Sequence, residues 1–223
     1  MKSEMDYQKA RQSMVDSQIH PMGVVSETIL HAFETVPREE FVPEEFKQIC
    51  YLDEDIEVAK KRFILEPSVL SRLLEEAKIQ NDDAVLTIGS GAGYSAAILS
   101  FLCKTVVALE NNEDFLSSAQ CAWDKLGYSN IASIAGPLEQ GAEKYAPYDV
   151  ILFNGAIAQI PKTFISQLKI GGRILAVIRK DNINIAKATI FEKTSDETLA
   201  SRILFDAGTP FLDGFEPEKE FIF

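Results

Sequence analysis

The sequence predicts an α/β protein, with a doubly wound, mostly parallel sheet of about seven strands and a helical extension at the N-terminus. Two observations support this. From Pro67 onward, apolar strand-like runs alternate with amphipathic helix-like segments. Several runs are apolar along their whole length, which is typical of strands that helices cover on both faces. Residues before Pro67 lack this alternation. We therefore expect residues 1–66 to form a helical extension that ends in a loop and packs on an α/β core over residues 67–223.

The elements of the core follow in order. Residues 67–78 predict a helix with one apolar face, made by Val69, Leu70, Leu73, Leu74 and Ala77. Beyond it we expect further helices at 94–103, at 112–127, which ends at Gly127, and at 160–169. Strands are expected at 84–89, 105–110, 130–136, 148–156, 171–178, 188–193 and 201–207. Because the last strands follow one another without a helix, they predict an antiparallel hairpin at the sheet edge.

Composition and charge exclude several classes of partner. A formal net charge of −12 argues against a nucleic-acid-binding surface. The longest apolar stretch is interrupted by Lys104 and is too short to span a membrane. The first 13 residues have no apolar core, so they do not resemble a secretory signal. We therefore expect a cytoplasmic protein that is a monomer or a weak dimer.

Cysteine and histidine usage predicts no metal site. The chain has three widely spaced cysteines without a C-x-x-C motif, and only two histidines. Zinc sites need a closely spaced set of such ligands. Cys50, Cys103 and Cys121 are therefore interpreted as reduced thiols.

A glycine-rich turn joins the expected strand 84–89 to the helix that begins near Tyr94. Gly89, Gly91 and Gly93 allow positive φ angles and close approach of a ligand to the backbone. Glu110 ends the next strand, where a carboxylate can accept hydrogen bonds from ribose hydroxyls. The pair indicates a nucleotide-like cofactor, and a tight turn without a ligand is the alternative.

The spacing of the glycines narrows the choice of cofactor. The dinucleotide pattern G-x-G-x-x-G is absent because its last position is Tyr94, and G-x-x-x-x-G-K-[ST] is absent too. The spacing G-x-G-x-G is typical of S-adenosylmethionine-dependent methyltransferases. We therefore expect S-adenosyl-L-methionine as the cofactor, contacted by Gly89, Ser90, Gly91, Gly93, Tyr94, Glu110 and Asn111. For Asn111, a plain turn role is equally compatible with the sequence.

From about Arg11 to Lys180 the chain resembles the protein-L-isoaspartate O-methyltransferase family. The resemblance is carried by RQSMVDSQI, VPREEFVP, TIGSGAGYSAAIL and QLKIGGRIL, the last preceded by YAPYDVILFNGA. It implies a Rossmann-like core of the class I S-adenosylmethionine-dependent methyltransferases. It further implies a cytoplasmic enzyme that methylates an exposed carboxylate of a damaged protein or peptide, which does not require a strong base because carboxylates are ionised near neutrality.

The chain departs from the family pattern at several positions. The family motif G-Q-T-I-S-x-P aligns with residues 61–67, so that Arg62 replaces the glutamine and Phe63 and Leu65 replace two hydroxyl-bearing residues. The adenine-side motif G-D-G aligns with residues 136–138, which places Pro137 and Leu138 beside the cofactor. Thr87 stands where an acid usually precedes the turn, and residues 154–157 replace T-A-A-A. Two alternatives therefore stay open, a different methyl acceptor or a relative that binds without catalysing transfer.

Two residues of this rewritten loop, residues 61–67, are candidates for a catalytic role. Arg62 could bind a substrate carboxylate in bidentate fashion, although its lysine neighbours favour a solvent-exposed arginine. Glu66 could orient the sulfonium, although capping of the helix that begins near Ser68 is favoured. Phe63 and Leu65 are interpreted as packing residues. The tail from Gly208 to Phe215 could fold over the site.

Overall fold

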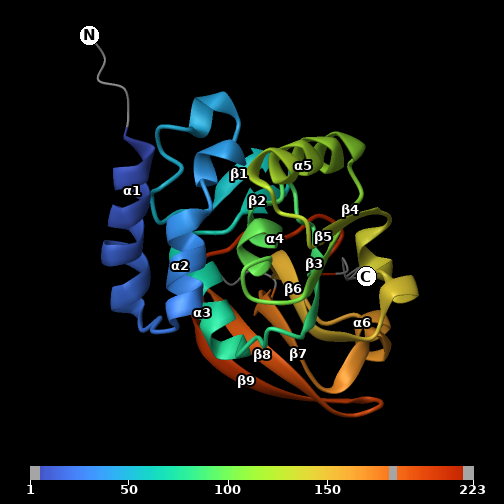
Figure 1. The fold of residues 1–223 in the computed structure, drawn as a ribbon. Coiled ribbons are helices and arrows are strands. Elements are labelled where there is room, and N and C mark those ends of the chain that lie inside the picture. The colour runs from blue at the N-terminus through green and yellow to red at the C-terminus, as the bar shows by residue number, and fades with distance from the viewer. Residues whose placement is uncertain (1–5, 181–184, 218–223) are drawn as a thin grey trace, which may run out of the picture.

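The computed structural model describes residues 6–180 and 185–217, and its centre is a seven-stranded sheet with helices on both faces (Figure 1). Five strands run parallel in the spatial order β5-β4-β3-β6-β7, and β8 and β9 complete one edge. The strands are β3 Ala84–Ile88, β4 Thr105–Glu110, β5 Ile131–Ala135, β6 Tyr148–Ile157, β7 Leu168–Ile178, β8 Ala186–Ser195 and β9 Thr198–Ala207. Because β8 is antiparallel to both β7 and β9, the predicted edge hairpin is confirmed.

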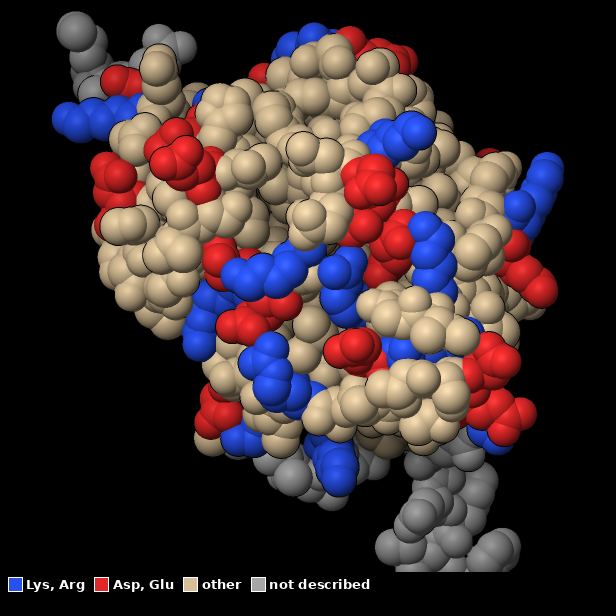
Figure 2. All heavy atoms as spheres, turned by 60° about the horizontal axis from the view of Figure 1, so that its bottom comes forward, with Lys and Arg blue, Asp and Glu red and all other residues tan. Residues whose placement is uncertain are grey.

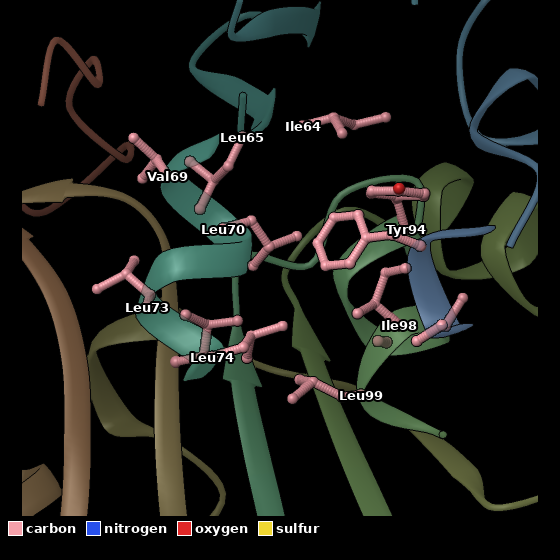
Figure 3. Packing of buried hydrophobic residues seen from close by; sticks show 14 of the residues in the cluster. Ile64, Leu65, Val69, Leu70, Leu73, Leu74, Tyr94, Ile98 and Leu99 are labelled. Atoms are coloured by element: carbon pink, nitrogen blue, oxygen red, sulfur yellow. The ribbon is translucent and has the colours of Figure 1, made fainter. Parts of the chain in front are cut away.

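Two apolar layers cover the two faces of the sheet. Successive residues of β3 alternate between them, since Val85 belongs to one cluster and Leu86 to the other. The larger cluster joins the sheet to α3 Pro67–Ala77, α4 Tyr94–Leu99 and α5 Glu113–Leu126. The smaller one joins it to α6 Lys162–Gln167 and to the C-terminal tail. In Figure 3, Leu70 and Leu74 of α3 point toward the side of Tyr94 and Ile98 of α4, whereas Val69 and Leu73 point to the other side of the helix. These features confirm the predicted doubly wound α/β class.

The N-terminal part is helical, as predicted, up to about residue 46. It contains α1 Tyr7–Met14, a π-helical turn Val15–Ile19, α2 Glu27–Thr35 and short 3-10 turns. Phe33 of α2 and Leu70 of α3 belong to the same apolar cluster, so packing is continuous across Pro67. The division of the chain at residue 66 stays a prediction, and its outer ends, 1–5 and 218–223, lie outside the described residues.

The expectation of helix and loop up to residue 66 is wrong for the last segment of the N-terminal part, which forms strands. Strands β1 Ile56–Ala59 and β2 Arg62–Ile64 form an antiparallel hairpin. The turn between them contains Lys61 with a φ of 55°, a conformation in which glycine or asparagine is the usual signal. Because lysine fills that position, the sequence gives no hairpin signal there.

The C-terminal tail runs along the end of β6. Pro210 O accepts a hydrogen bond from the Ala156 N–H at 2.7 Å, and the Leu212 N–H donates to Ala156 O at 2.9 Å. The Leu212 side chain is fully buried. This tail therefore closes over the sheet next to the glycine turn.

Candidate active site

The glycine turn connects β3 to α4 at the carboxyl end of the parallel strands. Gly89, Gly91 and Gly93 have φ angles of 65°, 51° and 93°, which confirms the left-handed conformations expected of the turn. Gly93 O accepts a hydrogen bond from the indole of Trp123 in α5 at 3.1 Å. A Cβ atom on Gly93 would lie 2.6 Å from the Trp123 ring, so only glycine fits there.

Glu110 lies directly beside this turn, as its place at the end of β4 predicts. Its side chain is fully buried. Oε2 accepts a hydrogen bond from the Gly91 N–H at 3.0 Å, and Oε1 accepts from the N–H groups of Asn111 and Asn112 at 2.9 and 3.2 Å. The acid and the glycine turn thus form one hydrogen-bonded unit.

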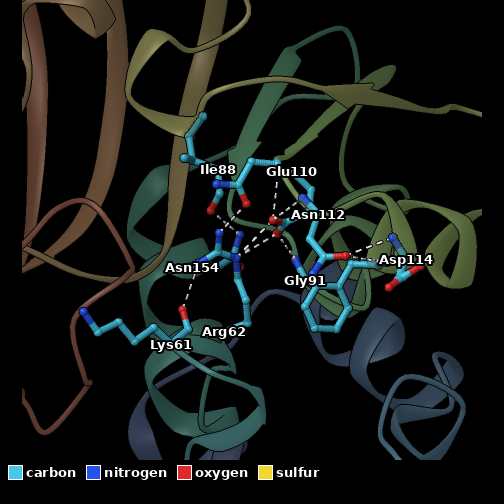
Figure 4. A network of polar contacts seen from close by, with 10 residues as sticks. Lys61, Arg62, Ile88, Gly91, Glu110, Asn112, Asp114 and Asn154 are labelled. Carbon is cyan, nitrogen blue, oxygen red and sulfur yellow. Dashed lines mark hydrogen bonds and ion pairs between the residues drawn. The ribbon is translucent and has the colours of Figure 1, made fainter.

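Arg62 completes the network around Glu110 (Figure 4). Its Nε donates to both Glu110 oxygens, at 3.1 and 3.2 Å, and its Nη2 donates to Asn111 Oδ1 at 2.6 Å. Nη1 donates to the carbonyl of Lys61 at 3.0 Å. Only 4% of Arg62 is exposed, so the interpretation as a solvated surface arginine is wrong. The guanidinium points into the site, toward Glu110 and Asn111.

Glu66 occupies the N-cap position of α3, but its side chain makes no capping hydrogen bond. Asp53 Oδ1 instead accepts from the Ser68 N–H at 2.9 Å, and Asp55 Oδ1 accepts from the Glu66 N–H at 3.0 Å. The expected side-chain cap is therefore wrong, since carboxylates of the preceding loop serve the helix start. Burial, together with the nearby charges of Asp55, Asp53 and Glu54, raises the pKa of Glu66 to about 7.

The apolar residues of the rewritten loop pack in the interior. Phe63 and Leu65 are buried, which confirms their interpretation as packing residues. The Tyr94 ring also lies in the core, in edge-on contact with Phe33 and Phe41, and burial raises its pKa to about 12. Its hydroxyl has no hydrogen-bond partner among the described residues.

The remaining expected cofactor residues lie around the same end of the sheet. Ser90 is buried in the glycine turn, and its hydroxyl finds no partner in the described part of the chain. Pro137 follows β5 and is exposed, whereas Leu138 is buried in the smaller apolar cluster. Contact of these residues with a cofactor stays a prediction.

Sequence reasoning missed one polar pair in this site. Asn154 Nδ2 donates to Thr87 Oγ1 at 2.7 Å and to Ile88 O at 2.9 Å, and both side chains are buried. Each residue departs from the family pattern on its own strand. The two residues meet because β3 and β6 are neighbouring strands of the sheet, which the sequence does not show.

The space above the turn is filled by the protein itself. The cavity between Phe63, Ser90 and Asn154 has no room for a water molecule. A Cβ on Gly89 would lie 2.6 Å from Leu212 of the tail, and a Cβ on Gly91 would lie 3.8 Å from Val58 of β1. In this arrangement the residues expected to hold S-adenosylmethionine do not fit it.

The described residues form neither a metal-binding cluster nor a membrane-spanning helix. Within residues 6–180 and 185–217, no three histidine, cysteine, aspartate or glutamate side chains gather as a metal-binding group would. The same part of the chain contains no helix with the length and apolar character needed to cross a membrane.

The fold and the site define the class of protein first. A seven-stranded doubly wound sheet with a glycine turn and an acid on the neighbouring strand is the architecture of class I S-adenosylmethionine-dependent methyltransferases. The chain belongs to the protein-L-isoaspartate (D-aspartate) O-methyltransferase family, whose model matches residues 9–206.

Individual relatives agree with this assignment. A protein-L-isoaspartate O-methyltransferase of Koribacter versatilis is 36% identical over 74% of this chain and 74% of its own length. One of Methanoculleus marisnigri is 34% identical over 76% and 77%.

Solved structures share the fold. A protein-L-isoaspartate O-methyltransferase structure superposes with a TM-score of 0.80 and 25% identity, covering 93% of this chain and 66% of that one. A Plasmodium falciparum protein assigned to the same enzyme, in complex with S-adenosyl-L-homocysteine, gives a TM-score of 0.75 at 16% identity, covering 91% and 98%.

Proposed function

We propose that this protein is an S-adenosylmethionine-dependent O-methyltransferase that methylates an exposed carboxylate, of the isoaspartyl type, in damaged proteins. The observation that carries the proposal is the joining of Glu110 to the Gly91 N–H at the carboxyl end of the sheet. The family match spans both this core and the N-terminal segments in front of it.

Arg62 and Glu66 are the two residues of the rewritten loop that the sequence nominates as catalytic candidates. The Arg62 guanidinium points into the interior and is bonded to Glu110, the carboxylate expected to hold the ribose hydroxyls of the cofactor. Glu66 lies at the start of α3, where the nearby charges of Asp55, Asp53 and Glu54 act on its carboxyl group. We propose that Arg62 acts through its contact with Glu110 rather than by binding a substrate carboxylate, and that Glu66 has a structural role.

A second candidate function has its own support. Phe63 and Leu65 remove two hydroxyl groups from the segment that resembles the family's substrate-side motif, and both side chains are buried. A protein with this loop would accept a different carboxylate, or would bind the cofactor without transferring its methyl group.

A transfer assay with matched peptides separates the two candidates. The protein is incubated with methyl-labelled S-adenosylmethionine and a short peptide that contains one isoaspartate, or the same peptide with normal aspartate. The proposal predicts a base-labile methyl ester on the isoaspartyl peptide and none on its twin. No ester on the isoaspartyl peptide, in a preparation that binds S-adenosylhomocysteine, would favour the second candidate.

We further propose a cytoplasmic protein that acts on protein carboxylates as a monomer or weak dimer. Its cysteines support the compartment, because Cys50, Cys103 and Cys121 are all free thiols. Burial raises the pKa of Cys50 to about 11 and that of Cys103 to about 12, which keeps both unreactive. On the face shown in Figure 2, basic and acidic side chains are interspersed, so that face presents no large patch of one sign.

A further inference from the structure

The carboxylate of Glu110 has no free hydrogen-bonding capacity. Its two oxygens accept from the N–H groups of Gly91, Asn111 and Asn112, and from Nε of Arg62. An ionised carboxylate has about four lone-pair sites. The three backbone donors belong to the turns that position the acid, so Arg62 is the one donor that can leave without unfolding them.

Arg62 enters the site on a short element. The β1–β2 hairpin has four residues in one strand and three in the other, and it also brings Val58 over Gly91. At its turn, Lys61 forms ion pairs with Glu216 and, at 3.5 Å, with Asp213 of the C-terminal tail. The side chain of Lys61 is 42% exposed, so these outer contacts are weak. Ile56, Phe63 and Ile64 anchor the hairpin in the apolar core, and Arg62 is its polar contact with Glu110.

Arg62 can leave the Glu110 carboxylate only when other hydrogen-bond donors take its place. A buried carboxylate that loses its partner is strongly destabilised, so Glu110 does not release the guanidinium into an empty cavity. A ligand with two adjacent hydroxyl groups supplies the donors that the carboxylate needs. The released guanidinium is weakly hydrated and sits on a long stem near the exposed turn of the hairpin, where it can reach water.

We propose that Arg62 is an internal competitor of the methyl donor: the guanidinium and the ribose hydroxyls of S-adenosylmethionine occupy Glu110 in turn, and the Arg62 side chain swings out toward the turn of the hairpin. This inference rests on the proposed function, because it takes the ligand from there. The apparent affinity for the methyl donor is the intrinsic affinity multiplied by the fraction of molecules in which Arg62 has left Glu110.

The test compares three proteins in calorimetric titrations with S-adenosylhomocysteine. Arg62→Gln keeps an amide that can hydrogen-bond to Glu110 but removes the charge. Arg202→Gln is the matched control, since Arg202 forms a 2.8 Å ion pair with Glu76 on the surface of the molecule. Fluorescence of Trp123, the single tryptophan, gives a second readout because its indole is hydrogen-bonded to the glycine turn.

Arg62→Gln is expected to bind S-adenosylhomocysteine about tenfold tighter or more than the wild type, because in most wild-type molecules Arg62 occupies Glu110 and blocks the ligand. Arg202→Gln is expected to bind like the wild type. Cooperative thermal unfolding shows that each variant is folded. If Arg62→Gln does not fold, Arg62→Lys takes its place, with a smaller gain expected because an ammonium lacks the planar fork of donors.

Two results would overturn the inference, and they differ in what they say about function. Equal affinity of the wild type and the Arg62 variant would show that Arg62 does not compete, while the proposed function would stand. No binding by any of the three proteins at millimolar ligand would remove both the competition and the proposed function.

Discussion

At the scale of single residues, acidic side chains crowd the loop before α3. Asp53 and Asp55 accept hydrogen bonds from the backbone at the start of that helix, and Glu66 lies among them without a cationic partner among the described residues. Burial raises the pKa of Asp55 as well. The hydrogen bonds to Asp53 and Asp55 therefore hold the loop in a form that brings like-charged carboxyl groups close together.

This crowding predicts a pH dependence of stability. The pKa of Glu66 is raised from 4.5 to about 7, so between these values the folded protein binds more protons than the unfolded chain. The contribution of protonated Glu66 to the free energy of unfolding is fully present below pH 4.5 and is lost as pH rises through about 7. Glu66→Gln mimics the protonated form, so it should not show the loss of about 2 kcal/mol in unfolding free energy that the wild type shows as the carboxyl ionises.

Urea unfolding at pH 5 and pH 8 measures this effect. The wild type should lose more stability than Glu66→Gln between the two pH values. Glu197→Gln, in the exposed turn between β8 and β9, should follow the wild type. Parallel profiles for wild type and Glu66→Gln would show that the carboxyl is ionised in the folded protein throughout.

At the scale of elements, the turn between β3 and α4 depends on glycine for two reasons. Gly93 has a φ of 93°, and its Cα faces Trp123 and Ala119 of α5 so closely that a Cβ would lie 2.6 and 2.9 Å from them. Gly127, which ends α5, has a φ of 80° and open space around it. The two positions share the backbone requirement and differ in packing.

Alanine at these glycines separates the two contributions. Gly127→Ala should destabilise the protein by about 1–2 kcal/mol through backbone strain alone. Gly93→Ala adds overpacking of about 1–3 kcal/mol and should also change the emission of Trp123. Guanidinium unfolding followed by fluorescence measures both, and equal losses would contradict the packing argument.

The elements of the core could be predicted because each carries its own local signal. Periodicity defines α3, and the glycine spacing and terminal acid define the turn and the end of β4. The β1–β2 hairpin carries no such signal, since Lys61 occupies its turn and its strands are only a few residues long. The burial of Arg62 follows from this hairpin, so it could not be predicted either.

Side-chain partners that belong to different strands were equally hidden. Thr87 and Asn154 are 67 residues apart, and only the pairing of β3 with β6 shows that each satisfies the other. The start of α3 shows the same limit, because Asp53 supplies the acceptor that the sequence assigned to Glu66.

At the scale of the whole molecule, three distant segments meet at the carboxyl end of the sheet. The hairpin contributes Arg62 and Val58, the centre of the chain contributes the glycine turn and Glu110, and the tail contributes Leu212. Lys61 joins the first segment to the last. This convergence explains why a chain with a recognisable cofactor turn has no room above it.

A crystal structure of the protein in the presence of saturating S-adenosylhomocysteine tests this account most directly. The account predicts that the ligand's ribose hydroxyls donate hydrogen bonds to the Glu110 oxygens, while the Arg62 side chain has moved away from the carboxylate. A ligand bound while the Arg62–Glu110 pair remains intact would contradict it, because the guanidinium and the ribose would then not share one carboxylate.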